Sequence, residues 1–260
     1  MDLGIEGRRA LVMGASRGIG RGIAAALARE GARVAISSRS EEALTEAGEA
    51  ITEQVGEAGA QSPEVGVFPA DTADLDRISK LPGEVAAELG PIEILVLNTG
   101  GPPPGAALDN TPEEWEEAFR SLVMAPRMLI EAVLPGMRER GWGRIANVSS
   151  SSIREPIPGL TLSNANRMAA LGLLDTLASE VAGDGVTVNT VATGMIATDR
   201  LRSMHGSLDE AERAARERVP AGRLGTPEEY GDLVAFLCSE RAAYLTGAVI
   251  PLDGGLLRSV

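Results

Sequence analysis

Short apolar runs recur along the chain, and each is followed by a segment with a different pattern. The runs have the length of strands, and residues 92–97 are apolar almost throughout, as a strand covered on both faces should be. The runs lie at residues 10–13, 33–37, 65–70, 92–97, 143–148, 186–191 and 248–252. They predict seven strands.

The segments between these runs predict helices, because apolar residues recur there at helical spacing. Capping residues stand at several starts: Ser40 precedes two glutamates, and Thr111 and Thr226 each precede Pro-Glu-Glu. The helix after Thr111 should run to about residue 140. Further helices are expected at about 74–89, 162–182 and 198–218, the last of them polar and weakly tethered.

Strands and helices therefore alternate from one end of the chain to the other. This alternation predicts an α/β fold with a doubly wound, seven-stranded parallel sheet that is flanked by helices. No linker, internal repeat or low-complexity tract interrupts the pattern, so one domain over residues 1–260 is expected.

A glycine-rich turn joins the first strand to the first helix. Gly14, Gly18 and Gly20 follow the run 10–13, and apolar residues then recur at helical spacing from Ile19. Glycines allow a tight turn and a close approach of the backbone to a pyrophosphate, and the N–H groups at a helix start favour negative charge. A turn without any ligand is the alternative, but the strand before it and the helix after it favour a dinucleotide site.

The charge and composition of the chain exclude some classes of binding partner. The formal charge of −13 argues against nucleic acid and anionic membranes, and no run is long enough to span a bilayer. With no signal peptide and a single cysteine, Cys238, expected to be buried, a cytoplasmic protein is predicted. Lys80 is the only lysine, so nearly all basic residues are arginines.

Several motifs, taken in order, resemble those of the short-chain dehydrogenase/reductase family, and within it the 3-oxoacyl carrier-protein reductase type. They are Gly14-Ala15-Ser16-Arg17-Gly18-Ile19-Gly20, Asp71, Asn98-Thr99-Gly100, Ser150, Thr193-Gly194 with Thr198, and Thr246-Gly247 with Asp253-Gly254-Gly255. The resemblance covers nearly the whole chain. It implies a Rossmann-type fold and a nucleotide site, whereas activity depends on the residues of the site itself.

The charge at the end of the second strand bears on the choice of cofactor. NAD-binding proteins place a carboxylate there for the ribose 2′-hydroxyl, but this chain has Ser38 and Arg39. A guanidinium attracts a 2′-phosphate, and Arg17 can add a second positive charge, so NADP(H) is favoured over NAD(H). The resemblance implies cofactor contacts from Gly14, Ser16, Arg17, Gly18, Ile19, Gly20, Ser38, Arg39, Asp71, Thr72, Asn98, Gly100, Arg167, Gly194, Ile196 and Thr198.

The catalytic positions depart from the family pattern of asparagine, serine, tyrosine and lysine. Counted from Ser150, the tyrosine and lysine positions hold Ser163 and Arg167, and the asparagine position holds Leu122. An aliphatic hydroxyl is a far weaker acid than a tyrosine whose pKa is lowered by a cation. Loss of a positioned proton donor typically costs on the order of 10² to 10⁴ in rate.

Ser150 and Ser163 would then hold a carbonyl oxygen, and Arg167 would bind the nicotinamide ribose and stabilise negative charge. The proton would come from water or from a mobile group, for which Glu155 and His205 are candidates, although either is more often a surface charge.

The two tyrosines are expected to lie elsewhere. Tyr230 and Tyr244 are in segments that lead away from the end of the fifth strand.

Three functions remain open. The first is an NADP(H)-dependent oxidoreductase that reduces a carbonyl or oxidises an alcohol of a small molecule. The others are a catalytically silent NADP-binding subunit or sensor, and a non-redox enzyme for a dehydration, isomerisation or cyclisation. The glycine turn, Arg39 and Ser150 favour the first, because hydride chemistry belongs mostly to the cofactor. No metal site is predicted.

Two segments are expected to line the mouth of the substrate pocket. They are Pro102-Pro103-Pro104 and the lid at about residues 195–220, where Met195, Ile196, Leu201 and Met204 form either an apolar wall or ordinary helix packing. A homotetramer is expected from the resemblance, with the helices that carry Trp115 and Arg167 and the apolar run 245–257 as its interfaces.

Overall fold

All strands belong to one parallel sheet in the computed structural model, which describes residues 1–57 and 65–259. The strands are β1 (Arg9–Met13), β2 (Arg33–Ser37), β3 (Val65–Val67), β4 (Ile94–Leu97), β5 (Gly143–Val148), β6 (Val186–Thr193) and β7 (Val249–Leu252). Their order is β3-β2-β1-β4-β5-β6-β7, and every neighbouring pair is parallel. The predicted seven-stranded sheet is confirmed. Its order reverses between β1 and β4, where ligands of such sheets bind at the carboxyl ends of the strands.

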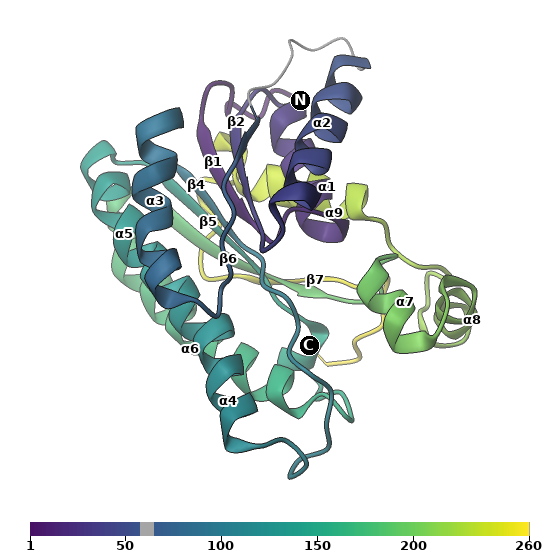
Figure 1. Cartoon of the computed structure of the whole chain (residues 1–260). Helices are drawn as coiled ribbons and strands as arrows, with labels where there is room; N and C mark the ends of the chain where they lie inside the picture. Colours follow the sequence, from purple (N-terminus) through teal and green to yellow (C-terminus); the bar gives the residue numbers. More distant parts are fainter. Residues whose placement is uncertain (58–64, 260) are drawn as a thin grey trace.

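Helices cover both faces of this sheet (Figure 1). One layer consists of α1 (Gly18–Arg29), α2 (Glu41–Glu57) and α9 (Pro227–Leu237), and the other of α3 (Leu75–Leu89), α5 (Ala125–Arg140) and α6 (Thr161–Val181). Successive side chains of a strand point to opposite faces, so Val12 enters the first hydrophobic core whereas Leu11 and Met13 enter the second. Burial on both faces explains why the strand runs are apolar.

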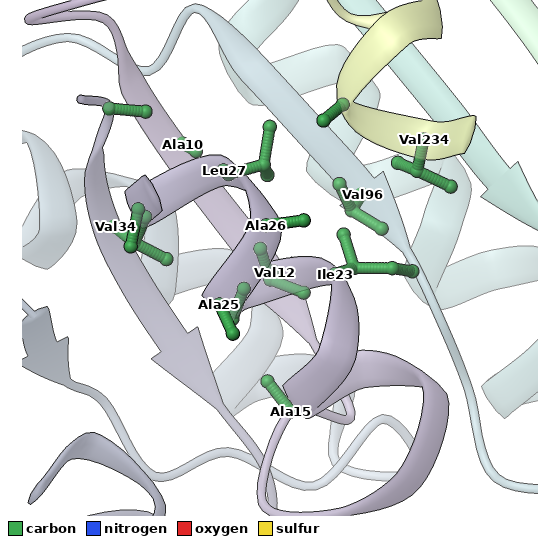
Figure 2. Packing of buried hydrophobic residues seen from close by; sticks show 14 of the residues in the cluster. Ala10, Val12, Ala15, Ile23, Ala25, Ala26, Leu27, Val34, Val96 and Val234 are labelled. Carbon is green, nitrogen blue, oxygen red and sulfur yellow. The ribbon is translucent and has the colours of Figure 1, made fainter. Parts of the chain in front are cut away.

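Close packing fixes the position of α1. In Figure 2, Ile23 of this helix lies over the sheet beside Val12 and Val96, and all three side chains are fully buried. On its other side α1 meets α9, where a Cβ on Gly231 would stand only 2.4 Å from the carbonyl oxygen of Gly22. Glycine therefore lets the two helices touch, and this contact holds the glycine turn that precedes α1.

The helical stretch that begins at Thr111 contains a widened turn. Thr111 and Glu114 form a capping box at the start of α4 (Pro112–Phe119). A π-helical turn, η1 (Arg120–Met124), then joins α4 to α5. Turns of this kind are frequent at functional sites, and this one contains Leu122.

The polar segment after Thr198 forms two helices, α7 (Asp199–His205) and α8 (Leu208–Arg218). Gly206 separates them in the left-handed region at φ +88°, and Ser207 caps α8 by accepting the N–H of Glu210. Both helices stand beside the main body of the molecule in Figure 1.

The expectation of weak tethering is wrong for α8. Its Ala211 and Ala215 are fully buried, because small apolar side chains on one face of an otherwise charged helix close a separate hydrophobic core. The other buried members of that core are Met195, Val219 and Leu224.

The amino-terminal edge of the sheet, opposite the expected site, is held by arginines. The guanidinium groups of Arg8 and Arg144 lie 3.9 and 4.4 Å from the ring centre of Trp142, whose indole N–H donates to Glu240. Arg8 also pairs with the buried Glu93 at 2.7 Å. These contacts tie the starts of three strands together and leave the carboxyl edge free for chemistry.

Short helical turns complete the chain. They are η2 (Ser151–Ile153), η3 (Ala182–Asp184) and η4 (Glu240–Ala242). Cys238 is buried, as predicted. Across the described ranges, none of the helices has the length and apolar character needed to cross a membrane.

Candidate active site

The glycine turn presents its backbone, rather than side chains, to the crevice at the carboxyl ends of the strands. Gly14 and Gly18 have φ values of +60° and +55°, which favour glycine. A Cβ on Gly20 would stand 2.2 Å from the carbonyl oxygen of Gly14, which also accepts the side-chain N–H of Asn98 at 3.1 Å. α1 has neither a side-chain cap nor an acidic residue in its first turn. Its first N–H groups are therefore available to an anion.

The loop after β6 returns to this turn. Thr198 caps α7, and its methyl carbon lies 3.2 Å from where a Cβ on Gly18 would stand. A surface pocket is lined by residues of both segments, including Arg17, Gly18 and Thr198. Gly194 is also needed at its place, since a Cβ there would be 2.4 Å from the Cα of Asp253. Ile196 is buried in the core beneath this loop.

The end of β2 carries the residues expected to select the cofactor. The hydroxyl oxygen of Ser38 is buried and has no hydrogen-bond partner among the residues that the structure describes. Arg39 beside it is exposed. Arg17 is exposed as well, and its guanidinium lies 3.6 Å from the carboxylate of Asp199. Asp71 accepts the backbone N–H of Ala73 through one carboxylate oxygen, which leaves the other oxygen for a ligand.

The catalytic positions meet through Arg167. Its Nε donates to the hydroxyl oxygen of Ser163 at 3.1 Å, and its terminal nitrogen donates to the carbonyl of Val148 at 3.0 Å. Ser163 and Arg167 are one turn apart on α6, whereas Val148 ends β5 two residues before Ser150. The guanidinium therefore connects the two elements that carry the predicted catalytic serines.

Arg167 is a cation at neutral pH. Burial and the positive charge of Arg200 lower its pKa to about 10, still far above neutrality. Its nitrogen donors polarise the hydroxyl of Ser163, which keeps its own proton for donation to another group. Leu122, at the asparagine position, is buried against Val123 and Ala170, so the surroundings of this position are apolar.

Known proteins resemble this chain over nearly its whole length. A family model described as Enoyl-(Acyl carrier protein) reductase matches residues 14–257. The 3-oxoacyl-[acyl-carrier-protein] reductase FabG of Vibrio harveyi is 36% identical over 254 residues, which are 98% of this chain and 99% of that protein. The chain belongs to the short-chain dehydrogenase/reductase family.

Solved structures of family members superimpose on nearly the whole chain. The L-sorbose reductase of Gluconobacter frateurii, complexed with NADPH and L-sorbose, has a TM-score of 0.93 at 31% identity, with 100% of both chains covered. A 3-oxoacyl (acyl-carrier-protein) reductase of Agrobacterium tumefaciens C58 with NADP bound has a TM-score of 0.88 at 29% identity, covering 98% of this chain and 96% of that one. The predicted family and its oxidoreductase class are confirmed.

Neither candidate for a separate proton donor is well placed in this family member. The carboxylate of Glu155 accepts the backbone N–H groups of Arg258 and Ser259 at 3.0 and 2.9 Å. These bonds lower its pKa, so it holds no proton to give at neutral pH. His205 lies at the carboxyl end of α7, and no contact ties it to Ser150 or Ser163 in the described part of the chain.

Tyr230 reaches the carboxyl edge of the sheet at the end of β6, whereas the sequence indicated only that its segment leads away from the end of β5. It is fully buried on α9, and its hydroxyl lies 2.8 Å from that of Thr193, at the end of β6. α9 packs against α1, and this long-range contact brings the tyrosine back to the sheet. Burial raises the pKa of Tyr230 well above its usual range, so the tyrosine is no substitute for the missing acid. Tyr244, by contrast, is fully exposed.

Tyr230→Phe is expected to reduce the loss of folding stability that accompanies a rise in pH above about 10. The folded state keeps the hydroxyl protonated, whereas the unfolded state ionises above about pH 10. Stability from this group is therefore complete below pH 10 and declines above it, by at most about 1.4 kcal/mol per pH unit. Urea unfolding between pH 8 and 11 measures the slope, and equal slopes for wild type and Tyr230→Phe would contradict the assignment.

Proposed function

We propose that this protein is an NADP(H)-dependent oxidoreductase that reduces a carbonyl, or oxidises an alcohol, of a small molecule. The hydrogen bond from Arg167 to Ser163 carries this proposal. This pair places a hydroxyl beside a cation on one face of α6, next to Ser150 at the end of β5. The tyrosine and lysine of the family pattern would supply the same two groups. NADPH and NADP in the related structures support the choice of cofactor.

The residues around the glycine turn fit the cofactor. The free N–H groups at the start of α1 would bind the diphosphate, with Thr198 close by. The unpaired hydroxyl of Ser38 and the exposed Arg39 would bind the ribose and its 2′-phosphate. Arg167 would also contact the nicotinamide ribose. When bound, the cofactor supplies or accepts a hydride.

Ser163 would serve as the proton donor in carbonyl reduction. Its oxygen already accepts from Arg167, so its hydroxyl hydrogen is free to bond to the substrate oxygen, which Ser150 would also hold. As negative charge develops on that oxygen, Ser163 transfers its proton. The guanidinium then stabilises the serine oxygen until water returns a proton. Because Arg167 is charged and partly buried, its effect exceeds that of a solvated cation.

Ser163→Ala should lower kcat by about 10² or more, since it removes the proton donor. NADPH consumption with activated ketones and aldehydes measures kcat, and NADPH fluorescence measures Kd, which should change less than about twofold. Ser179→Ala is the control, because Ser179 is an exposed serine on the same helix. If wild type binds NADPH but reduces nothing, the silent-binder alternative replaces this function.

Arg39→Ala should remove most of the preference for NADPH. Wild type is expected to bind NADPH at least about tenfold more tightly than NADH, or roughly 1.4 kcal/mol, within reach of one charge-assisted contact. Arg39 should dominate, because Arg17 already pairs with Asp199. Calorimetric titration with both nucleotides tests this, with Arg213→Ala on α8 as the control. Equal affinities in wild type would rule out the assignment.

The assembly and the lid belong to the same proposal. Residues 195–220 would cover the substrate, and the chain would form a homotetramer in the cytoplasm. β7 is half-exposed at the sheet edge, and Phe119 and Met168 are exposed on α4 and α6, as unpaired interface elements would be. Light scattering at micromolar concentration measures the mass, and a monomer would contradict this assembly.

A further inference from the structure

One arginine of the lid reaches back over the site, although no motif singles it out. Arg200, on the first turn of α7, donates to the carbonyl oxygens of Gly101 and Pro102 at 3.2 and 3.5 Å. The guanidinium occupies the space that a side chain at position 101 would need, since a Cβ on Gly101 would stand 2.0 Å from its Cζ. The loop after β4 therefore accommodates this arginine specifically.

Arg200 brings a second cation to the region of Arg167. Arg167 bonds the Val148 carbonyl at the end of β5, and Arg200 bonds the loop that follows β4. Because β4 and β5 are neighbours in the sheet, the two guanidinium groups lie at adjacent strand ends, and the charge of Arg200 contributes to the lowered pKa of Arg167. Neither forms an ion pair with a carboxylate in the ranges that the structure describes: the guanidinium groups bond carbonyl and hydroxyl oxygens instead. The acidic residues nearby are used elsewhere: Asp199 pairs with Arg17 and Arg202, and Glu155 holds the backbone of Arg258 and Ser259.

We infer that Arg200, together with Arg167, binds a negatively charged group of the substrate, so that the protein acts on anionic carbonyl or hydroxy compounds. This inference rests on the proposed function. A carboxylate or phosphate between the two guanidinium groups would relieve their repulsion and accept paired hydrogen bonds from either. The chain as a whole carries −13, which repels an anion, so local positive charge is needed where one must enter.

The diphosphate of the cofactor is the other anion that could meet Arg200. The two sources differ in what a substitution changes. A substrate contact alters the preference for acids over neutral compounds and leaves cofactor affinity intact, whereas a diphosphate contact does the reverse. Arg200 bonds the loop after β4, and Arg167, at the end of the neighbouring strand β5, contacts the proton-donating Ser163; this placement favours the substrate.

Matched pairs of acid and ester test the inference. Pyruvate, levulinate and phenylglyoxylate are each compared with their methyl esters, by kcat/KM with NADPH and by saturable change of the fluorescence of bound NADPH. Wild type should prefer at least one acid over its ester by about tenfold or more, which is about 1.4 kcal/mol. Arg200→Met should bring the acid-to-ester ratio of kcat/KM close to one and leave the Kd for NADPH unchanged. Arg202→Met, which alters an exposed arginine of the same helix, should behave as wild type.

Several results would overturn the inference. They are esters that bind as well as acids, a ratio that survives Arg200→Met, and weaker NADPH binding with an unchanged ratio, which would assign Arg200 to the diphosphate. The proposed function fails separately, through absence of NADPH binding or of turnover on every carbonyl. Selective binding of acids to the NADPH complex, lost in Arg200→Met, would support the anion site even without turnover.

Discussion

Replacing Arg167 by alanine is expected to lower kcat for carbonyl reduction by about 10³, within the range measured when a proton donor or a charge-stabilising group is removed. The guanidinium polarises Ser163 through Nε and holds the end of β5 through the Val148 carbonyl. Alanine removes both contacts and the positive charge. The loss should appear mainly in kcat, because the charge matters most when the substrate oxygen becomes negative.

Arg167→Lys is the matched variant for this experiment. Lysine is the usual residue of the family at this position and keeps the charge, so it should recover activity to within about tenfold of wild type. Steady-state kinetics and the Kd for NADPH are measured on all three proteins. If Arg167→Ala keeps its kcat and only raises KM, the arginine binds the cofactor or substrate and takes no part in proton transfer.

Gly20→Ala is expected to weaken NADPH binding by at least about 100-fold, equivalent to roughly 2.7 kcal/mol. The added carbon would stand 2.2 Å from the Gly14 carbonyl oxygen and 2.7 Å from the Asn98 amide nitrogen. Gly14 is part of the turn itself, and Asn98, which follows β4, is hydrogen-bonded to it, so relief of the clash must displace the N–H groups that would bind the diphosphate. Calorimetric titration measures the affinity, and circular dichroism shows whether the protein still folds.

Gly83→Ala is the control for the effect of the methyl group alone. Gly83 lies in α3 with no atom within 4 Å of the place where its Cβ would stand, so alanine should raise stability by about 0.5–1 kcal/mol. NADPH affinity should not change. Unimpaired NADPH binding by Gly20→Ala would mean that the turn tolerates displacement and that the cofactor does not depend on its geometry.

The fold could be predicted because its signals are local. Each strand is a short apolar run, and Thr111 and Thr226 lie at helix starts where the structure shows capping boxes. The break between α7 and α8 at Gly206 could also have been predicted, because Ser207 with Glu210 three residues later is a capping signal.

The site could be predicted only where family motifs name its residues. Arg200 resembles any surface arginine in a chain that scarcely uses lysine, and only the folded loop at Gly101 reveals its contact. Tyr230 reaches the end of β6 because α9 packs on α1, a contact between residues about 200 positions apart in the sequence. Such placements depend on tertiary packing, for which a short window of sequence holds no signal.

The π-helical turn η1 bears on how this site could change during evolution or redesign. The backbone at Leu122 is already widened, so the family's usual asparagine could be introduced there without remodelling the helix. The obstacle is chemical: the leucine packs against Val123 and Ala170, and an unpartnered amide in such a place costs roughly 1–3 kcal/mol. A stepwise path toward the ordinary catalytic set should therefore change Ser163 and Arg167 first. Leu122 should follow only when those changes have brought polar groups or water into its surroundings.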